Sequence, residues 1–326
     1  MVTWFRHGLP DIRGRLLDRL LIWAAALLVI AVAAFAAYYY FDQRLQKEEV
    51  STGTAQHDLA VYEQAVRDDP QDPSARVVLA QLYFAAERYD EAIEQYRAAL
   101  SLDEGNTAAL LGLGRALLDA GNATAATESF EKIIAQAAEA DIAGDYVEAA
   151  HYYTGSIALD QQRPAEAIAH FEEAVAIERG DADAWHMLGA AHLQNGELDE
   201  AITALARAVL YVPNFTEAYE KLAVAYDGKG MTGESRYARG MVAYSRGQHA
   251  EALRELQAAT EASPTFAAAY VGLGLTREAR SERELAVAAY QRALQLDPAS
   301  FTAQTGLARL SASATPNAAE PTRTAP

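Results

Sequence analysis

The feature that most constrains the fold of this chain is a unit of 34 residues that recurs through most of its length, most clearly at residues 182–215. In the first half of this copy, Trp185, Leu188 and Gly189 lie three residues and one residue apart. Residues three or four positions apart are neighbours on a helical surface, so these side chains share one face of a helix. The first half of the unit is therefore predicted to be a helix with one apolar face.

The second half of the copy predicts another helix, because Ala201, Leu205 and Ala208 also follow one another at helical spacing. Gly196 is expected to end the first helix, since glycine adopts the left-handed conformation that such an end requires. Pro213 lies just past the second helix, where a missing N–H costs little. The small residues let the two backbones approach closely. A single pair of helices cannot bury its own apolar face, so the copies are expected to stack.

This pattern resembles the tetratricopeptide repeat, a helix–turn–helix unit of about 34 residues. The resemblance covers roughly residues 56–313 and implies an all-α fold, a right-handed solenoid of helical hairpins over residues 54–313. Full units begin near residues 73, 107, 148, 182, 233 and 267, and half units are expected near 54–72, 216–232 and 301–313. The segment 216–232 has no second helix, so it is expected to kink the solenoid or to divide it into two blocks.

Residues 20–41 are an uncharged, largely apolar run with aromatic residues near both ends. As a helix this run spans roughly 33 Å, enough for the hydrocarbon core of a bilayer. Residues 1–19 carry more basic residues than the short segment after the run, which places residues 1–19 in the cytoplasm and the repeats across the membrane. The sequence thus predicts a single-pass membrane protein with a linker at residues 42–53 and a disordered tail at residues 314–326. A cleaved signal peptide remains an alternative, because residues 34–36 read Ala-Phe-Ala.

The composition argues against several kinds of chemistry. The chain has no cysteine, which excludes disulfides and thiolate catalysis, and its seven histidines form no recognisable metal-ligand motif. Gly112-Leu113-Gly114 imitates a dinucleotide-binding loop, but no strand precedes it. The net charge of −18 disfavours binding to nucleic acid. We therefore expect no enzymatic activity, no cofactor and no metal. The acidic residues indicate either solvated helix faces or a basic partner.

Stacked first helices line the concave side of a solenoid of this kind. The residues that the repeat register places on that side are Val77, Gln81, Phe84, Leu111, Arg115, Leu118, Tyr152, Ser156, His186, Tyr237, Met241 and Tyr244. Some members of the tetratricopeptide family bind a peptide's terminal carboxylate through Lys and Asn at two of these places, and this chain has neither there. The aromatic and aliphatic lining suits an amphipathic helix or an extended peptide. The alternative is that these side chains only fill gaps between helices.

These patterns together predict a membrane-anchored scaffold that binds protein or peptide partners, membrane complexes among them, on its concave face. Its layout is similar to that of bacterial envelope proteins that assist translocation, maturation or assembly. The alternatives are a secreted protein, a structural protein that associates with its own copies, and an accessory subunit of an enzyme complex.

Overall fold

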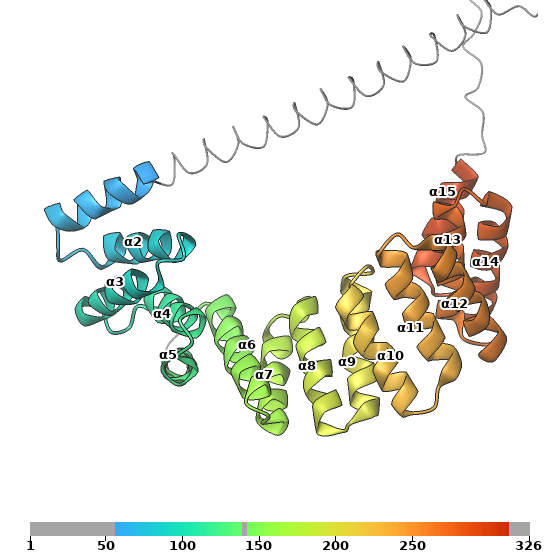
Figure 1. The fold of residues 1–326 in the computed structure, drawn as a ribbon, viewed down its shortest axis with the longest axis horizontal. Helices are drawn as coiled ribbons and strands as arrows, with labels where there is room; N and C mark the ends of the chain where they lie inside the picture. Colours follow the sequence, from blue (N-terminus) through green and yellow to red (C-terminus); the bar gives the residue numbers. More distant parts are fainter. Residues whose placement is uncertain (1–55, 139–141, 313–326) are drawn as a thin grey trace, which may run out of the picture. The chain divides into compact units, whose positions relative to one another are not determined.

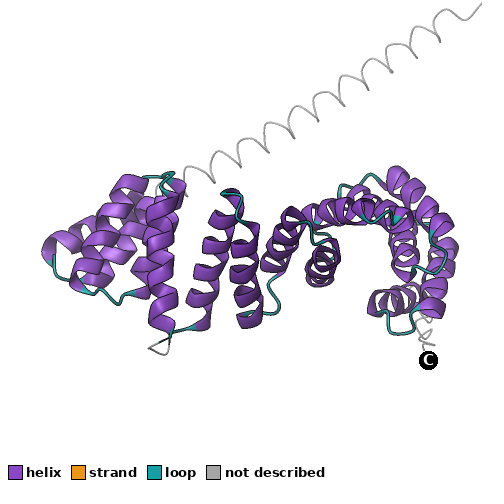
Figure 2. Ribbon diagram, turned by 90° about the horizontal axis from the view of Figure 1, so that it is seen from below, coloured by secondary structure: helices purple, strands orange, loops and turns teal. Residues whose placement is uncertain are grey.

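The structure is a computed structural model of the chain, and it describes residues 56–138 and 142–312. All regular elements in these two ranges are helices (Figure 2). The predicted anchor at residues 20–41, the segments 1–19 and 42–53 on either side of it, and the tail at residues 314–326 lie outside the described residues. Within the ranges described, no helix combines the length and the apolar character needed to cross a bilayer.

The chain divides into two compact units, residues 1–95 and residues 96–326. In the first unit, a helix at residues 56–68 precedes α2 (Pro73–Ala85) and the start of α3 (Tyr89–Leu102). The Tyr83 hydroxyl donates a hydrogen bond to Glu63 Oε1 at 3.0 Å and so ties α2 to the preceding helix. The Arg88 guanidinium lies 4.4 Å from the centre of the Tyr83 ring. The expected half unit near residues 54–72 is therefore a packed helix over the part that is described.

The second unit is a succession of antiparallel helices, labelled in Figure 1. After the end of α3 come α4 (Thr107–Asp119), α5 (Ala123–Ala137), α6 (Gly144–Asp160), α7 (Pro164–Ile177), α8 (Ala182–Asn195), α9 (Leu198–Tyr211), α10 (Thr216–Gly228), α11 (Thr232–Ser245), α12 (His249–Ala262), α13 (Ala267–Ala279), α14 (Arg283–Leu296) and α15 (Phe301–Ala312). Each helix packs against the next one, and α4, α6 and α8 also contact one another in sequence. This order matches the helical hairpins that the 34-residue unit predicts.

Local sequence sets the ends of these helices. The Asp181 carboxylate accepts the backbone N–H groups of Asp183 and Ala184 and so caps the start of α8. At the other end of α8, Gly196 has φ = 81°, the left-handed conformation expected of it. Pro164 occupies the first turn of α7, where its missing N–H is not needed. These capping residues fix where each hairpin turns.

Small residues lie between facing helices, as the repeat pattern predicts. A Cβ atom at Gly189 of α8 would lie 2.5 Å from Leu205 Cγ of α9. Glycines 114 and 274 meet the rings of Phe130 and Tyr290 in the same manner. These three large side chains are fully buried. The close approach of the hairpin helices therefore depends on a glycine facing one large apolar residue.

The half unit at residues 216–232 does not interrupt the core. Its single helix, α10, packs on α9 and also directly on α11. One cluster of buried side chains runs from Leu205 of α9 through Leu222 and Met241 to Leu273 of α13. The expectation that the solenoid divides here is thus wrong for its core, because α11 takes the place that a second helix would have beside α10.

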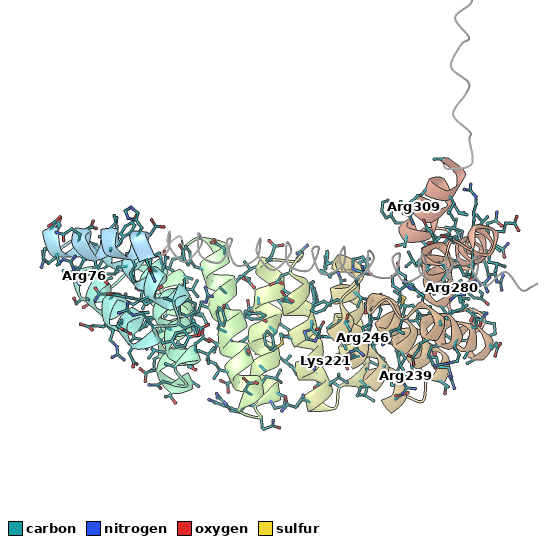
Figure 3. The ribbon with its side chains drawn as sticks, turned by 45° about the horizontal axis from the view of Figure 1, so that its top comes forward. Arg76, Lys221, Arg239, Arg246, Arg280 and Arg309 are labelled. Atoms are coloured by element: carbon teal, nitrogen blue, oxygen red, sulfur yellow. The ribbon has the colours of Figure 1, made fainter. Side chains whose placement is uncertain are left out.

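The last helix, α15, packs on α13 and α14. Arg309 of α15 donates two hydrogen bonds to the Glu278 carboxylate of α13, at 2.5 and 2.7 Å, and Figure 3 labels Arg309 on this helix. Ala303, Gly306 and Leu310 are its buried residues, and most of its other side chains are polar or small. Leu307 is partly buried against the core, whereas the Phe301 side chain is 78% exposed.

Candidate protein-binding surface

In the first compact unit, the predicted binding residues of α2 have three different environments. Val77 is buried in the core, so it contributes packing and no accessible surface, contrary to its predicted place on a binding face. Gln81 is exposed. Phe84 is half-buried, and its ring meets that of Tyr89 edge-on at 5.7 Å. Of the three residues, Gln81 and Phe84 reach the surface.

In the second unit, the predicted residues of α4 lie at the surface beside α6. Leu111 and Leu118 are half-buried, and Arg115 is exposed. The Arg115 guanidinium lies 5.9 Å from the centre of the Tyr153 ring, which itself stacks on Phe130 at 5.2 Å. A guanidinium over an aromatic face is attracted by the negative charge density of the ring. This surface combines two aliphatic side chains with a positioned cation.

The predicted residues of α6 and α8 continue this surface. Tyr152 is half-buried and meets Phe171 edge-on at 5.9 Å, and burial raises its pKa to about 12. Ser156 is half-buried one helical turn further along α6. On α8, His186 packs against the Phe215 ring at 4.9 Å, and burial lowers its pKa, so its imidazole is neutral at neutral pH. We call Leu111, Arg115, Leu118, Tyr152, Ser156 and His186 the first-helix surface.

The predicted residues of α11 lie in a different environment, because α11 packs directly on α10 as well as on α12. Met241 is 3% exposed and belongs to the core, and it reaches the surface only as part of the lining of a hollow described below. Tyr237 keeps part of its surface exposed, but burial of its hydroxyl end raises its pKa well above the usual value. Its ring meets Tyr219 of α10 edge-on at 6.0 Å. Because α10 has no second helix of its own, it packs directly on α11. Tyr244 remains half-buried, beside the His249 ring.

A mainly apolar hollow of about 340 Å³, which we call the aromatic pocket, lies among α9, α10, α11, α13 and the turn into α15. Its aromatic lining is Tyr219, Tyr226, Tyr237 and Phe266. The rings of Tyr237 and Phe266 meet edge-on at 5.2 Å. The repeat register predicted only Tyr237 and Met241 of its lining. The missing second helix after α10 is the sequence signal that could have indicated the other lining residues of this pocket.

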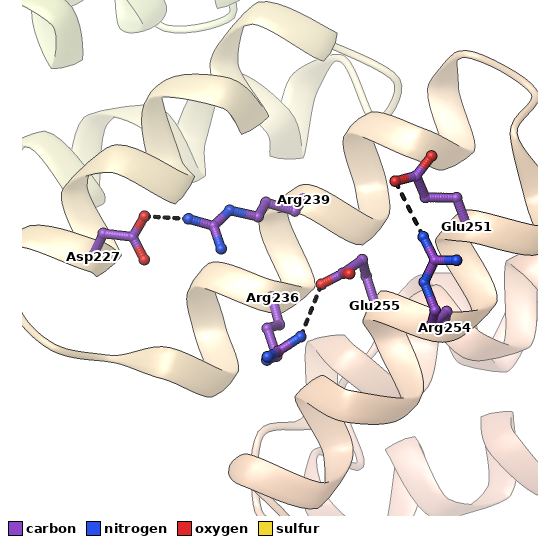
Figure 4. Close-up of polar contacts among 6 residues, drawn as sticks. All are labelled: Asp227, Arg236, Arg239, Glu251, Arg254 and Glu255. Carbon is purple, nitrogen blue, oxygen red and sulfur yellow. Dashed lines mark hydrogen bonds and ion pairs between the residues drawn. The ribbon is translucent and has the colours of Figure 1, made fainter.

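A second hollow, of about 480 Å³, lies over α10, α11 and α12 and is lined mainly by charged groups that satisfy one another. Asp227 accepts from Arg239 at 2.5 Å, and Glu220 accepts from Arg246. Figure 4 shows the Asp227–Arg239 pair with two neighbouring pairs, and Figure 3 labels Arg239 and Arg246. Since the charges are mutually paired, this hollow offers little net field to a charged ligand.

Two carboxyl groups from consecutive repeats meet at the start of α6 and α8. Burial, together with the neighbouring Asp181 carboxylate, which shares a hydrogen bond with it, raises the pKa of Glu148 to about 7. The charges of Asp181 and Asp183 also act on the nearby Tyr152 hydroxyl. The edge of the first-helix surface beside Tyr152 is therefore acidic.

The histidines and carboxylates of the described residues are dispersed along the helices rather than gathered at a metal centre. No group of three or more His, Asp or Glu side chains among them is placed to hold a metal ion. His151 and His170 approach at 3.1 Å between their Nδ1 atoms, which makes one imidazole the donor and the other the acceptor of a hydrogen bond. The first-helix surface and the aromatic pocket both suit contact with another polypeptide.

Comparison with known proteins agrees with this architecture. Two family models, both described as tetratricopeptide repeat, match the chain, one at residues 84–144 and 158–225 and the other at residues 59–107 and 237–301. Together they cover more than half of the sequence. No curated protein matches the chain significantly.

Among solved structures, the chain is similar to the C-terminal part of a tetratricopeptide repeat-containing protein from Cytophaga hutchinsonii, with 17% identity and a TM-score of 0.51 over 79% of this chain and 96% of the other. A tetratricopeptide repeat protein from Parabacteroides merdae has 17% identity and a TM-score of 0.47, over 80% of this chain and 94% of the other. The MamA protein has 26% identity and a TM-score of 0.49, over 55% of this chain and 94% of its own. The matched segments, the stacked hairpins and the glycine-to-large-residue contacts agree, and the chain belongs to the tetratricopeptide repeat family.

Proposed function

We propose that this chain is a non-catalytic scaffold that is held in a membrane by residues 20–41 and binds a protein partner with the first-helix surface. The observation that carries the proposal is the row of half-buried Leu111, Leu118 and Tyr152 side chains on consecutive first helices, with Arg115, Ser156 and His186 among them. Apolar side chains that are held in place lose little entropy when a partner covers them, and the polar groups between them fix the partner's register.

The partner segment that fits this surface carries both apolar and basic side chains. Leu111, Leu118 and Tyr152 offer apolar contact along α4 and α6. Beside Tyr152, burial and the nearby Asp181 carboxylate together raise the pKa of Glu148 to about 7. A lysine or arginine placed there would relieve this repulsion between like charges. The chain's net charge of −18 would also speed the approach of a basic partner.

The proposed anchor gives the scaffold its setting. A single membrane span at residues 20–41, with residues 1–19 in the cytoplasm, places the repeats on the far side of the membrane. Confinement to the membrane plane raises the effective concentration of membrane-bound partners. A role in cell-envelope assembly, translocation or maturation follows from this setting. Because the chain has no cysteine, single cysteines introduced at Gly8 and Glu172 test it. A maleimide that does not cross membranes should label Glu172→Cys but not Gly8→Cys in intact cells, and labelling of neither or of both contradicts the proposal.

The binding proposal is tested by a photo-reactive residue at position 152 in the full-length chain, with the exposed Glu172 of α7 as the matched control position. We expect position 152 to capture a protein and position 172 not to do so. Ser156→Arg, which adds a bulky cation one turn from Tyr152, should abolish the capture, whereas Glu172→Arg should not. No capture from position 152, or equal capture from both positions, contradicts this use of the surface.

A further inference from the structure

The aromatic pocket has an exposed aromatic residue beside it. Ser300 and Thr302 both line the pocket, whereas Phe301, between them, does not line it and is 78% exposed. Leu210 lines the pocket and is 71% exposed, so it lies at the mouth, and Tyr211 and Val212 beside it are exposed as well. Scattered exposed apolar residues are ordinary, but several of them around an apolar hollow indicate an interface.

The volume of the aromatic pocket is large enough for a phenyl ring such as that of Phe301. An apolar cavity of about 150 Å³ accommodates a benzene ring. The aromatic pocket, at about 340 Å³, has room for one phenyl ring and part of a second side chain. Its tyrosine and phenylalanine rings can meet an incoming ring edge-on, the arrangement that aromatic pairs favour. Phe301 lies in the first turn of α15, beside the pocket but outside its lining.

We propose that a second copy of this chain occupies the aromatic pocket, with Phe301 of each copy inserted into the pocket of the other. A twofold interface requires one surface patch to carry both a projecting group and its complement. Phe301 and the pocket meet this requirement because they are adjacent on one surface. Leu210 at the mouth adds apolar contact around the inserted ring. This dimer is independent of the first-helix surface, which lies on α4, α6 and α8.

Charge repulsion opposes the association, and it predicts how dimerisation depends on salt concentration. Each copy carries a net charge of −18, so two copies repel one another. Added salt screens this repulsion and leaves apolar burial intact. Dimerisation is therefore expected to strengthen as salt is added. An interface that depended on ion pairs would weaken under the same conditions.

Sedimentation of the full-length chain over a hundredfold range of concentration tests the dimer. Phe301→Ala should weaken dimerisation at least about tenfold. Ala268→Phe, which fills the pocket from its own wall, should do the same. Leu285→Ala removes an apolar side chain that is 49% exposed elsewhere, on α14, and should change nothing. An equal mixture of the Phe301→Ala and Ala268→Phe chains retains one complete contact, so it should dimerise more than either variant alone.

A photo-reactive phenylalanine at position 301 supplies a second measurement that does not depend on how well Ala268→Phe folds. Two differently tagged copies are expressed together, and the crosslinked peptides are identified by mass. Crosslinks from position 301 to α10, α11 or α13 of the other copy support the proposal. A chain that stays monomeric at all concentrations, a dimer that Phe301→Ala leaves intact, or crosslinks only to a different protein would each overturn it.

Discussion

The carboxyl group of Glu148 gives the most specific prediction about stability. It lies near the start of α6, and burial and the adjacent Asp181 raise its pKa from an ordinary glutamate value to about 7. A group whose pKa is raised on folding stabilises the folded state while it is protonated in both states. That contribution is fully present below the unfolded pKa, near 4.5, and is lost as the pH rises towards 7. Above pH 7, folding therefore places an unfavourable charge at this position.

The magnitude follows from the width of that pH window. Each pH unit between the two pKa values corresponds to about 1.4 kcal/mol, so the window limits the effect to about 3 kcal/mol. Solvent reaches part of the Glu148 side chain, and its proton is shared with Asp181, so we expect about 1–2 kcal/mol in practice. Glu148→Gln keeps the shape and the hydrogen-bonding capacity of the protonated acid at every pH. It should raise the free energy of unfolding by that amount at pH 8 and by almost nothing at pH 4.5.

Urea unfolding followed by helical circular dichroism, at pH 4.5 and pH 8, measures this difference. Asp181→Asn is the matched control, because asparagine caps the start of a helix as well as aspartate does but carries no charge. It should recover part of the gain at pH 8 by lowering the pKa of Glu148. A Glu148→Gln variant that is no more stable than the natural chain at pH 8, or that gains equally at both pH values, would refute the electrostatic account.

Substituting the fully buried Leu205 by alanine is expected to cost about 2–5 kcal/mol of unfolding free energy, whereas Leu210→Ala, at a residue that is 71% exposed, should stay within about 0.5 kcal/mol. Gly189→Ala places a methyl group 2.5 Å from Leu205 Cγ. The cost of crowding, about 1–3 kcal/mol, should exceed the gain in helix propensity of about 1 kcal/mol, so the variant should be less stable. A variant that is more stable in urea unfolding would contradict the packing described. Asn106→Ala removes the side chain that accepts the Ala109 N–H at 3.0 Å and should cost about 1 kcal/mol, while Asn106→Asp should retain most of the stability in thermal unfolding. Burial lowers the pKa of both His151 and His170, so their contribution to the free energy of unfolding is present above about pH 6.5 and is lost as the pH falls below it. His170→Phe should reduce this loss of stability at acid pH. A variant whose stability depends on pH as the natural chain's does would contradict this role of the two histidines.

The hairpin architecture could be predicted from the sequence because it depends on local spacing. Small residues such as Gly189 were expected to let the two helices of a unit approach closely, and the structure places Gly189 against Leu205 of the second helix. The end of α8 at Gly196 follows equally from one residue's conformational freedom. Features of this kind need only the helical period and the chemistry of helix ends.

The environment of α11 could not be predicted in the same way. The register makes α11 the first helix of the full unit that begins near residue 233, and on that basis Tyr237 and Met241 were placed on the concave face. With no second helix after α10, α10 and α11 pack directly together, and Met241 belongs to the core cluster that these helices share with α13. The length of the half unit at residues 216–232 showed that a second helix was missing, but it did not show that α11 would pack in the position of that helix.

The contact of Glu148 with Asp181 is an intermediate case. The two residues lie 33 positions apart, close to one repeat length, so they hold nearly equivalent places in consecutive units. Stacking at that period brings such places together, and a comparison of charges from unit to unit would have revealed the pair. The shift in pKa needs the burial as well, and only the structure supplies it.

The double use of α11 has a consequence for how the protein opens. In a regular array each hairpin can exchange its amide hydrogens almost independently of distant hairpins. Here α11 is the packing partner of both α10 and α12, so neither of these helices can open without disturbing the same element. The segment from α10 to α12 should therefore exchange as one cooperative block.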